Sequence, residues 1–386
     1  MVKLAHGVNP DLLRWARERA GMSVSDVATR LKKDSQLILD WEQRRDTPTF
    51  RQLEYLAETL YKRPIALFFF PQPPPEEEAK TRFRTLPKTE LEAFEADTRL
   101  ALREGLAFQQ SLSELTDGRN PAKHLITRDI DATPDKPVET LSSQVRQYLG
   151  VTLDEQSTWE NTEEAFKQWR SRLETVGVYI LKRSFKQKAI CGFCLYDNEY
   201  PLVVINNGTS HSRQTFTAFH ELAHLLFRIS GITKEDDNYI ALLQGREKRI
   251  EELCNAFAAE FLMPAATFPF SEFDTQRIDQ SVSTIARRYC VSREAVLRRI
   301  LDANLVDRGT YQRKKDEWDR EFLRSRKRGA GGDYYATKAT YLGEGFISLA
   351  FRRYHSGALD LTELARHLRV KATSVAGLED YAVSGR

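Results

Sequence analysis

The N-terminal part of the chain repeats apolar positions at helical spacing in four short stretches. Asn9 to Ala20 is the first, with Pro10 in its opening turn, and Gly21 ends it. Ser23 is placed to cap a second helix over 24–31. The remaining two have apolar positions at Leu37, Ile38 and Trp41 and, after Pro48, at Leu53, Leu56, Ala57 and Leu60. Short helices joined by tight turns predict a helix-turn-helix module.

The middle of the chain changes from helical to strand-like patterning. The stretch 71–78, rich in Pro and Glu, predicts a stiff, solvated linker. Helical spacing follows over 89–116 and again over 139–175. Runs of β-branched and aromatic residues then predict three strands, at about 177–182, 188–195 and 201–206. This order predicts an α+β fold with a small β-sheet.

Helical patterning resumes beyond the strands. Residues 281–303 predict a second helix-turn-helix-like pair, and residues 341–381 are mainly helical. Between them, 313–328 holds eight Lys or Arg against four acids, which we interpret as a solvated helix face rather than a nucleic-acid contact. The glycine-rich stretch 329–332 predicts a turn. One face of the last segment is apolar and consists of Leu361, Leu364, Ala365 and Leu368.

The composition limits the class of protein but does not identify its function. The chain has 386 residues, 41% hydrophobic and 29% charged, which is ordinary for a globular protein of two or three domains. A net charge of +3 is too small to indicate nucleic-acid binding by itself. No leader opens the chain and no apolar run is long enough to span a bilayer, so we expect a cytoplasmic protein without membrane contact.

The four cysteines do not predict a disulfide framework. Cys191 and Cys194 form a C-x-x-C pair, which redox sites and zinc knuckles share, but the pair lies in a predicted strand and has no second copy. Cys254 and Cys290 lie on predicted helices, where a thiol usually behaves as a small apolar side chain. We therefore expect all four to be core residues.

The run from Thr217 to His224 contains the chemistry-bearing motif H-E-x-x-H within apolar residues of helical spacing. His220 and His224 are four residues apart and project from one helix face, so both can bind a single Zn²⁺. Glu221 then lies where it can deprotonate a zinc-bound water. The alternative is a core helix with two satisfied histidines. The apolar side of the predicted helix consists of Phe216, Phe219, Ala223, Leu226 and Phe227.

The next apolar helix, residues 250–264, offers carboxylates for a third ligand. Glu251 and Asn255 are spaced i, i+4 and share one face, which predicts Glu251 as the ligand. Asn255 can then hydrogen-bond a zinc-bound imidazole and fix its tautomer. Glu252 lies about 100° further round the helix and is expected to face solvent.

These residues resemble the ImmA/IrrE family of metallopeptidases. The resemblance rests on F-T-A-F-H-E-L-A-H, followed by E-x-x-x-N-x-F-A-A-x-F-L-M-P from Glu251, and covers about 135–305. It implies a zincin-like, gluzincin-type zinc endopeptidase that cuts a specific repressor or partner protein. An extended substrate is expected to add to the edge of the strand ending at Asn206. The donor that stabilises the oxyanion is not assigned, with candidates His211, Arg213 and Tyr239 near the motif in sequence.

The N-terminal helices are similar to the Cro/CI-like, XRE-type DNA-binding domain. The similarity rests on Gly21-Met22-Ser23, Val27-Ala28, Trp41-Glu42 and Leu56-Ala57, although Val24, Lys32-Lys33 and Arg44 depart from the usual pattern. Asp34 and Asp40 would meet phosphate repulsion if they faced a groove. Side chains that can contact an operator in double-stranded DNA are Ser35, Gln36, Gln43, Arg44 and Arg45. The alternative is a module retained as a protein-binding or dimerising surface.

We therefore expect four parts: a helix-turn-helix domain at 1–70, a linker and helical connector at 71–135, the peptidase domain at 136–305, and a mainly helical C-terminal region at 306–386. Three functions fit this arrangement. The first is a zinc endopeptidase with a regulatory DNA-binding domain, and the second is a transcriptional repressor with a structural or vestigial zinc site. The third is an antitoxin that binds its cognate toxin and its own promoter with little proteolysis. The sequence leaves homodimerisation open.

Overall fold

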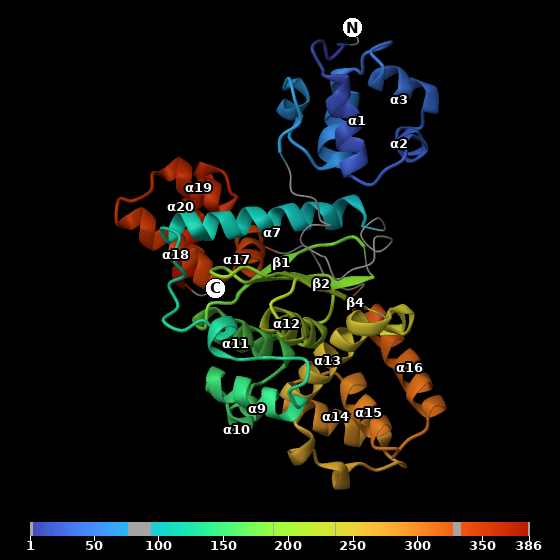
Figure 1. The fold of residues 1–386 in the computed structure, drawn as a ribbon, viewed down its shortest axis with the longest axis vertical. Helices are drawn as coiled ribbons and strands as arrows, with labels where there is room; N and C mark the ends of the chain where they lie inside the picture. The colour runs from blue at the N-terminus through green and yellow to red at the C-terminus, as the bar shows by residue number, and fades with distance from the viewer. Residues whose placement is uncertain (1–2, 76–93, 188, 236, 327–332, 385–386) are drawn as a thin grey trace. The chain divides into compact units, whose positions relative to one another are not determined.

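The computed structural model describes residues 3–75, 94–187, 189–235, 237–326 and 333–384 (Figure 1). The chain divides into two compact units. We call residues 1–106 with 184–188 the N-terminal unit, and residues 107–183 with 189–386 the sheet unit. The helix α7 (Ala96–Leu115) runs across the boundary between them.

The N-terminal unit is helical, and its helix ends follow the capping residues of the sequence. Asn9 accepts a hydrogen bond from the backbone N–H of Asp11, and Ser23 forms a reciprocal capping box with Asp26. These contacts confirm the predicted starts of the first two helices. The described helices before α7 are α1 (Pro10–Arg19), α2 (Val24–Leu31), α3 (Ser35–Glu42), α4 (Phe50–Glu54), the π-helix η1 (Tyr55–Tyr61) and the 3₁₀ helix η2 (Ile65–Phe69).

A buried ion pair joins the first helix of this unit to the third. Arg17 donates from Nε and Nη2 to the two carboxylate oxygens of Glu42, at 2.7 and 2.9 Å. Glu42 is only 4% exposed, so this forked pair is shielded from water. Leu12, Trp41 and Leu56 complete the core around it. Of the predicted linker, residues 76–78 lie outside the described residues, as do residues 89–93 of the predicted helix that becomes α7.

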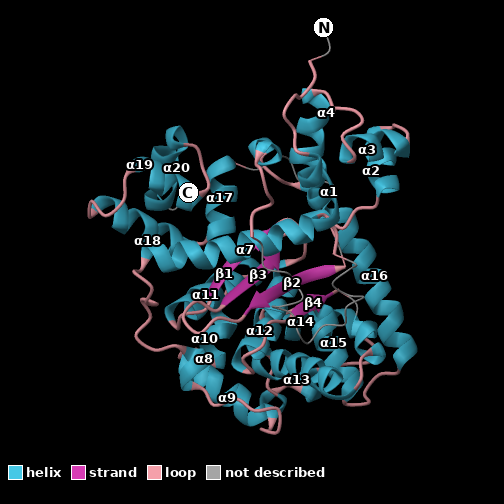
Figure 2. Ribbon diagram, turned by 45° about the horizontal axis from the view of Figure 1, so that its top comes forward, coloured by secondary structure: helices cyan, strands magenta, loops and turns pink. Residues whose placement is uncertain are grey.

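The sheet unit is built on four strands in the order β1-β3-β2-β4. β1 (Tyr179–Arg183) runs parallel to β3 (Leu202–Asn206), whereas β2 (Ile190–Leu195) is antiparallel to both β3 and β4 (Ile232–Lys234). Nearly every strand residue is buried because helices cover both faces. Figures 1 and 2 show α12 on one face and the second half of α7 on the other.

The strand order corrects one expectation about substrate binding. β3 pairs on both sides, with β1 and with β2, so its edge is not free to accept an added strand. The edge strand on the other side of β2 is β4, which the sequence did not predict because it is only three residues long. The three predicted strands are confirmed, each within about two residues of its expected ends.

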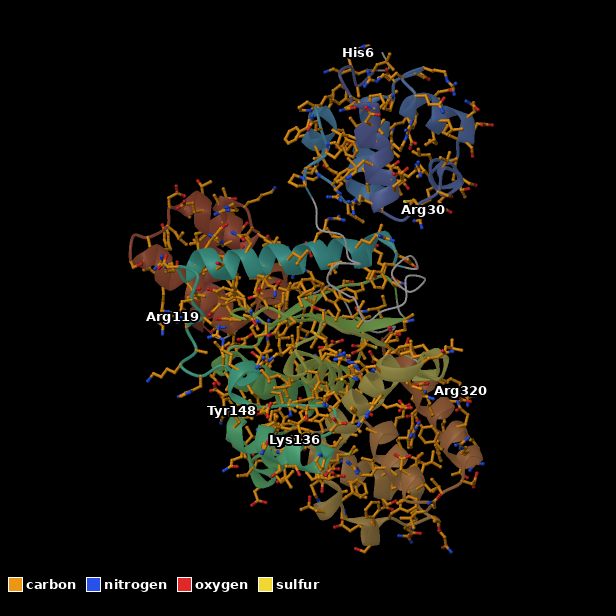
Figure 3. All side chains as sticks on the ribbon, in the orientation of Figure 1. His6, Arg30, Arg119, Lys136, Tyr148 and Arg320 are labelled. Carbon is orange, nitrogen blue, oxygen red and sulfur yellow. The ribbon has the colours of Figure 1, made fainter. Side chains whose placement is uncertain are left out.

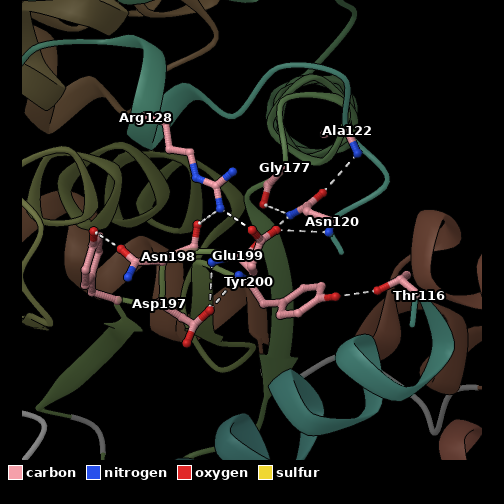
Figure 4. A network of polar contacts seen from close by, with 10 residues as sticks. Thr116, Asn120, Ala122, Arg128, Gly177, Asp197, Asn198, Glu199 and Tyr200 are labelled. Atoms are coloured by element: carbon pink, nitrogen blue, oxygen red, sulfur yellow. Dashed lines mark hydrogen bonds and ion pairs between the residues drawn. The ribbon is translucent and has the colours of Figure 1, made fainter. Parts of the chain in front are cut away.

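Side-chain hydrogen bonds fix the β2–β3 hairpin to the preceding chain (Figure 4). The Asn120 amide donates to the carbonyl oxygens of Gly177 and Glu199, at 3.1 and 2.6 Å. Arg128 pairs with the Glu199 carboxylate. The backbone N–H groups of Glu199 and Tyr200 both donate to Asp197, at 2.9 Å. The turn between β2 and β3 is therefore held by side chains of the preceding chain as well as by the backbone pairing of the two strands.

Helices pack around this sheet and bury a mainly aromatic core. Trp169 contacts Phe219 and Phe261 edge-on, with ring centroids 5.0 and 5.2 Å apart, and so joins three helices. The predicted helical stretch 139–175 is confirmed but broken into three helices. The helices between α7 and the end of α13 are α8 (Ile126–Asp129), α9 (Val138–Leu149), α10 (Leu153–Thr158), α11 (Thr162–Thr175), α12 (His211–Leu226), the 3₁₀ helix η3 (Asp237–Leu242) and α13 (Gly245–Leu262).

The C-terminal part is helical, as expected. The predicted pair at 281–303 is confirmed as two helices, and Arg320 lies on the exposed face of the charged helix that follows (Figure 3). Leu364, Ala365 and Leu368 are buried, whereas Leu361, the first residue of the helix, is 43% exposed. The expected turn at 329–332 lies outside the described residues. These helices are α14 (Ile278–Tyr289), α15 (Arg293–Asp302), α16 (Arg308–Arg326), α17 (Tyr334–Leu342), α18 (Glu344–His355), α19 (Leu361–Leu368) and α20 (Val375–Ser384).

Among the described residues, none of the helices combines the length and the apolar character that crossing a membrane requires.

Lys182, in β1, is a buried cation in this fold. Its side chain is 3% exposed, and its ammonium nitrogen lies 4.5 Å from the centroid of the Phe166 ring. Burial lowers the pKa of Lys182 to about 7, and the nearby charge of Arg170 acts in the same direction. The folded protein therefore binds fewer protons at this residue than the unfolded chain does between neutral pH and the ordinary lysine pKa.

Lys182→Met should therefore stabilise the protein, by roughly 1–4 kcal/mol at about pH 6. The gain should be complete below the folded pKa and shrink as pH rises towards 10, because the unfolded lysine then also loses its proton. Urea unfolding at several pH values measures this. Lys167→Met is the matched control, since Lys167 is 68% exposed and should show no such pH dependence.

Candidate metal centre

The helix α12 carries the H-E-x-x-H motif and is buried almost all round. Ser210 caps it by accepting a hydrogen bond from the N–H of Arg213. Gly192 of β2 lets the helix approach the sheet closely: a methyl group there would lie 2.7 Å from the Thr217 side chain and 2.8 Å from the Val204 carbonyl oxygen. The absence of a side chain at Gly192 therefore allows the short distance between α12 and β2.

His220, His224 and Glu251 converge on one point between α12 and α13. The two Nε2 atoms are 3.1 Å apart. The Glu251 carboxylate lies 3.3 Å from Nε2 of His220 and 3.4 Å from Nε2 of His224. These three side chains are 1%, 1% and 5% exposed. Two imidazole nitrogens and one carboxylate at such separations can all bind one ion.

Asn255 lies where the helix spacing predicted. Its Oδ1 is 2.8 Å from Nδ1 of His220. When Nδ1 carries the proton and donates this bond, the lone pair of Nε2 points towards Glu251 and is available to a metal ion. This contact can therefore orient His220 and leave its Nε2 available to a metal ion.

Glu221 is fully buried next to these donors. Its Oε1 accepts a hydrogen bond of 2.6 Å from the Thr233 hydroxyl, which belongs to β4. Its Oε2 accepts no hydrogen bond of ordinary geometry from the described residues. Glu221 also raises the pKa of the nearby Cys194 thiol, although burial of that thiol is the larger cause. A buried carboxylate oxygen without a partner fits a water molecule bound beside it.

Gly231 precedes β4 and packs against the ring of His224. A methyl group added at Gly231 would lie 2.4 Å from both Cγ and Cδ2 of that imidazole. Real contacts are never that short, so only glycine leaves room for His224 in its present position. Gly231 and Thr233 were not singled out from the sequence, because nothing local connects them to a motif on another element.

The electrostatics of the site favour a bound cation. Burial alone would raise the pKa of Glu251, but the two imidazoles outweigh it and lower that pKa. Burial alone would lower the pKa of His224, but Cys254 and Glu251 outweigh it and raise that pKa. The Glu251 carboxylate therefore favours a positive charge at the imidazoles, whereas burial raises the pKa of the Cys254 thiol and favours its neutral form. A metal ion can supply that charge in place of a proton.

Cys254 is the residue that sequence reasoning missed here. As the sequence predicts, it is fully buried and forms no disulfide bond. However, its Sγ and one nitrogen each of His220 and His224 all lie within 4.8 Å of one another, so this buried group could hold a metal ion. The signal was available, because Cys254 is spaced i+3 from Glu251 and so shares its helix face.

Only one of the three oxyanion candidates reaches the site. The Tyr239 hydroxyl donates to Oε2 of Glu251 at 2.8 Å. Arg213 instead donates to the backbone carbonyl of Lys234, and the His211 ring lies against Phe166 with centroids 6.4 Å apart.

The remaining carboxylates of α13 lie away from the site. Glu252 is exposed and lies 3.9 Å from Lys248, as its place on the helix predicted. Glu260 is bound to Arg299 at 3.0 Å. Cys191 and Cys290, like Cys194, are buried and form no disulfide bond.

The residues expected to contact DNA are all exposed on the N-terminal unit. Ser35 and Gln36 begin α3, and Gln43 to Arg45 follow its end. Gln36 and Arg45 both bond to Asp40, at 2.9 and 2.7 Å, and Arg44 lies 3.4 Å from Asp11. Asp34 caps α3 by accepting from the N–H of Gln36. The surface is accessible, but the contacts with DNA stay a prediction.

Comparison with known families agrees with this geometry. Residues 173–301 match the Peptidase_M78 family, the IrrE N-terminal-like domain. The matched region runs from the end of α11 to the end of α15 and so contains every residue of the metal centre. No curated protein matches the chain. The Peptidase_M78 match supports a metal-dependent, protease-like role for residues 173–301, and it leaves the helix-turn-helix expectation untested.

The residues present fit such a metal. Two imidazole nitrogens with a carboxylate or thiolate form a donor set that suits Zn²⁺ rather than Mg²⁺ or Ca²⁺. The contact between Asn255 and His220 agrees with this, as does the Glu221 oxygen that accepts no hydrogen bond of ordinary geometry from the described residues.

Gly231→Ala should weaken zinc binding by about 10- to 100-fold, because the added methyl displaces the ring of His224. Competition with a chromophoric zinc chelator measures the change. Gly309→Ala is the control, since the methyl there would meet only the flexible carboxylate of Asp307. Equal zinc affinity in all three proteins would mean that His224 does not bind the ion.

Proposed function

We propose that this chain is a zinc-dependent endopeptidase joined to a DNA-binding module, and that it cleaves a specific repressor or partner protein. The observation that carries the proposal is the position of Glu221. This buried carboxylate has one oxygen anchored by Thr233, and among the described residues its other oxygen accepts no hydrogen bond of ordinary geometry, beside the converging donors of α12 and α13. A purely structural zinc site has no need for such a base.

Each residue of the site has a role in peptide hydrolysis. His220, His224 and Glu251 would hold the ion. A bound Zn²⁺ supplies Lewis-acid polarisation of a carbonyl and lowers the pKa of water. Glu221 takes the proton from the attacking water and delivers it to the leaving amine. Thr233 keeps Glu221 oriented for both transfers by donating to Oε1, which leaves Oε2 for the water. Tyr239 is the donor that we assign to the developing oxyanion, since its hydroxyl already lies at the ligand Glu251.

The substrate is expected to bind along β4. This strand lies at the edge of the sheet and carries Thr233, the partner of the catalytic base. An extended peptide that pairs with β4 through its backbone would pass beside Glu221. Pairing of this kind requires an unfolded segment in the target, which favours cleavage at an exposed loop or linker of a partner protein.

The N-terminal unit supports the DNA-binding part of the proposal. Its third helix presents Ser35 and Gln36 to solvent, and Arg44 and Arg45 follow. The two aspartates that would repel phosphate are engaged locally, Asp34 as the helix cap and Asp40 with Gln36 and Arg45. The cationic side chains can then approach the backbone of an operator.

Glu221→Gln should retain zinc and lose proteolysis, by about 10²- to 10⁴-fold. Glutamine keeps the size of the side chain and can still bond Thr233, but it cannot accept the proton. The purified protein and the variant are assayed for zinc and then incubated with the products of neighbouring genes, and discrete fragments are identified by mass spectrometry.

Glu252→Gln is the matched control, because Glu252 is exposed on the same helix as Glu251 but faces away from the site. It should cleave like the wild type. Zinc binding together with a stable, uncleaved complex with a neighbouring gene product would contradict the peptidase and support the antitoxin function instead.

Arg44→Ala and Arg45→Ala should each weaken binding to the promoter of the protein's own gene. If each arginine contacts one phosphate, each variant should reduce the slope of log affinity against log salt by about one. Fluorescence anisotropy over a salt series measures the slope. Arg30→Ala, on the preceding helix α2, serves as a comparison. Unchanged slopes in both variants would exclude this surface as the DNA contact.

A further inference from the structure

The proposed mechanism does not use Cys254, although its thiol lies among the metal ligands. Cys254 is 0% exposed and forms no disulfide. On α13 it lies three residues after Glu251 and one before Asn255, so one helix face presents a carboxylate, a thiol and an amide towards α12. Glu251 contacts both histidines, and Asn255 contacts His220. The thiol is the only member of this trio without a role.

Two three-donor sets share the two histidines: Glu251 completes one of them and Cys254 the other. The two Nε2 atoms and the Glu251 oxygens are 3.1 to 3.4 Å apart, and Cys254 Sγ lies within 4.8 Å of donor nitrogens on both histidines. Zn–N and Zn–O bonds of about 2.0–2.2 Å and a Zn–S bond of about 2.3 Å place tetrahedral donors roughly 3–4 Å apart. For all four to bind one ion, the Cys254 thiol and the Glu251 carboxylate must also come within this separation of each other.

The burial of the site agrees with a complete ligand shell. None of His220, His224, Glu251 and Cys254 is more than 5% exposed, and Glu221 is 0% exposed. Tyr239, from η3, contacts the outer oxygen of Glu251. A catalytic zinc has three protein ligands and an open position, whereas four protein ligands leave none.

We propose that Cys254 is the fourth protein ligand of the zinc ion, so that the resting enzyme holds the metal in a closed His220, His224, Glu251 and Cys254 site. This inference rests on the proposed zinc site. Hydrolysis then requires ligand exchange: one metal–sulfur bond breaks, water takes the vacated position, and no electron is transferred. The enzyme is latent until a substrate or partner displaces the thiolate.

The test is a spectroscopic measurement of the first coordination shell in the full-length protein. The zinc protein is examined by X-ray absorption, and the cobalt-substituted protein by ultraviolet and visible spectroscopy. We expect one sulfur scatterer at about 2.3 Å from zinc and a sulfur-to-cobalt charge-transfer band. Both signals should vanish in Cys254→Ala and in Cys254→Val, the second of which keeps the core volume filled.

Cys290→Ala is the matched control, since it also removes a buried thiol from a helix end but lies outside the donor set. It should retain both signals. Cys254→Ala should also bind zinc at least tenfold more weakly and, once loaded, cleave the substrate several-fold faster than the wild type, because water replaces the thiolate.

The outcomes separate this inference from the proposed function. Stoichiometric metal with only nitrogen and oxygen scatterers in the wild type would overturn the role of Cys254 and leave the peptidase intact. A sulfur signal that persists in both Cys254 variants would also overturn it. Failure of the wild type to bind zinc or cobalt would remove both the inference and the proposed function.

Discussion

The packing of α12 against α13 is the interaction on which the site depends. His220 and His224 come from one helix and Glu251 and Cys254 from the other, so no single element holds a complete donor set. The separation of the helix axes sets the distance between the imidazoles and the carboxylate. An error of about 1 Å in that separation would break the convergence of donor atoms that one ion requires.

Three features of the sheet unit keep that separation fixed. Gly192 lets α12 approach β2 without a side chain between them. Trp169, on α11, contacts Phe219 of α12 and Phe261 of α13, so one aromatic side chain braces both helices from behind. The stacked rings of Phe219 and Phe261, with centroids 4.1 Å apart, fill the space between the two helices. A close-packed core of this kind resists small displacements, and it therefore keeps the donor atoms of the two helices in position.

The short strand β4 and the residue before it contact two side chains of the site, Glu221 and His224. The strand positions Thr233 on Glu221, and Gly231 just before it leaves room for the ring of His224. Because the same strand forms a sheet edge, the hydrogen-bond partner of Glu221 and the backbone of that edge belong to one segment. Under the proposed function, a substrate that pairs with β4 would act directly on the geometry of Glu221 and His224.

What the sequence determined by itself is local. Helix periodicity and capping residues gave the ends of α1 and α2, and i, i+4 spacing placed His220 with His224 and Glu251 with Asn255 on shared faces. These relations hold within one helix, whose geometry is the same in every protein. The tertiary structure alone decided what meets across elements: Thr233 and Gly231 at α12, Cys254 beside His220 and His224, and β3 inside the sheet rather than at its edge. Such contacts join residues distant in sequence, and they depend on strand order and helix packing, which no short-range pattern specifies.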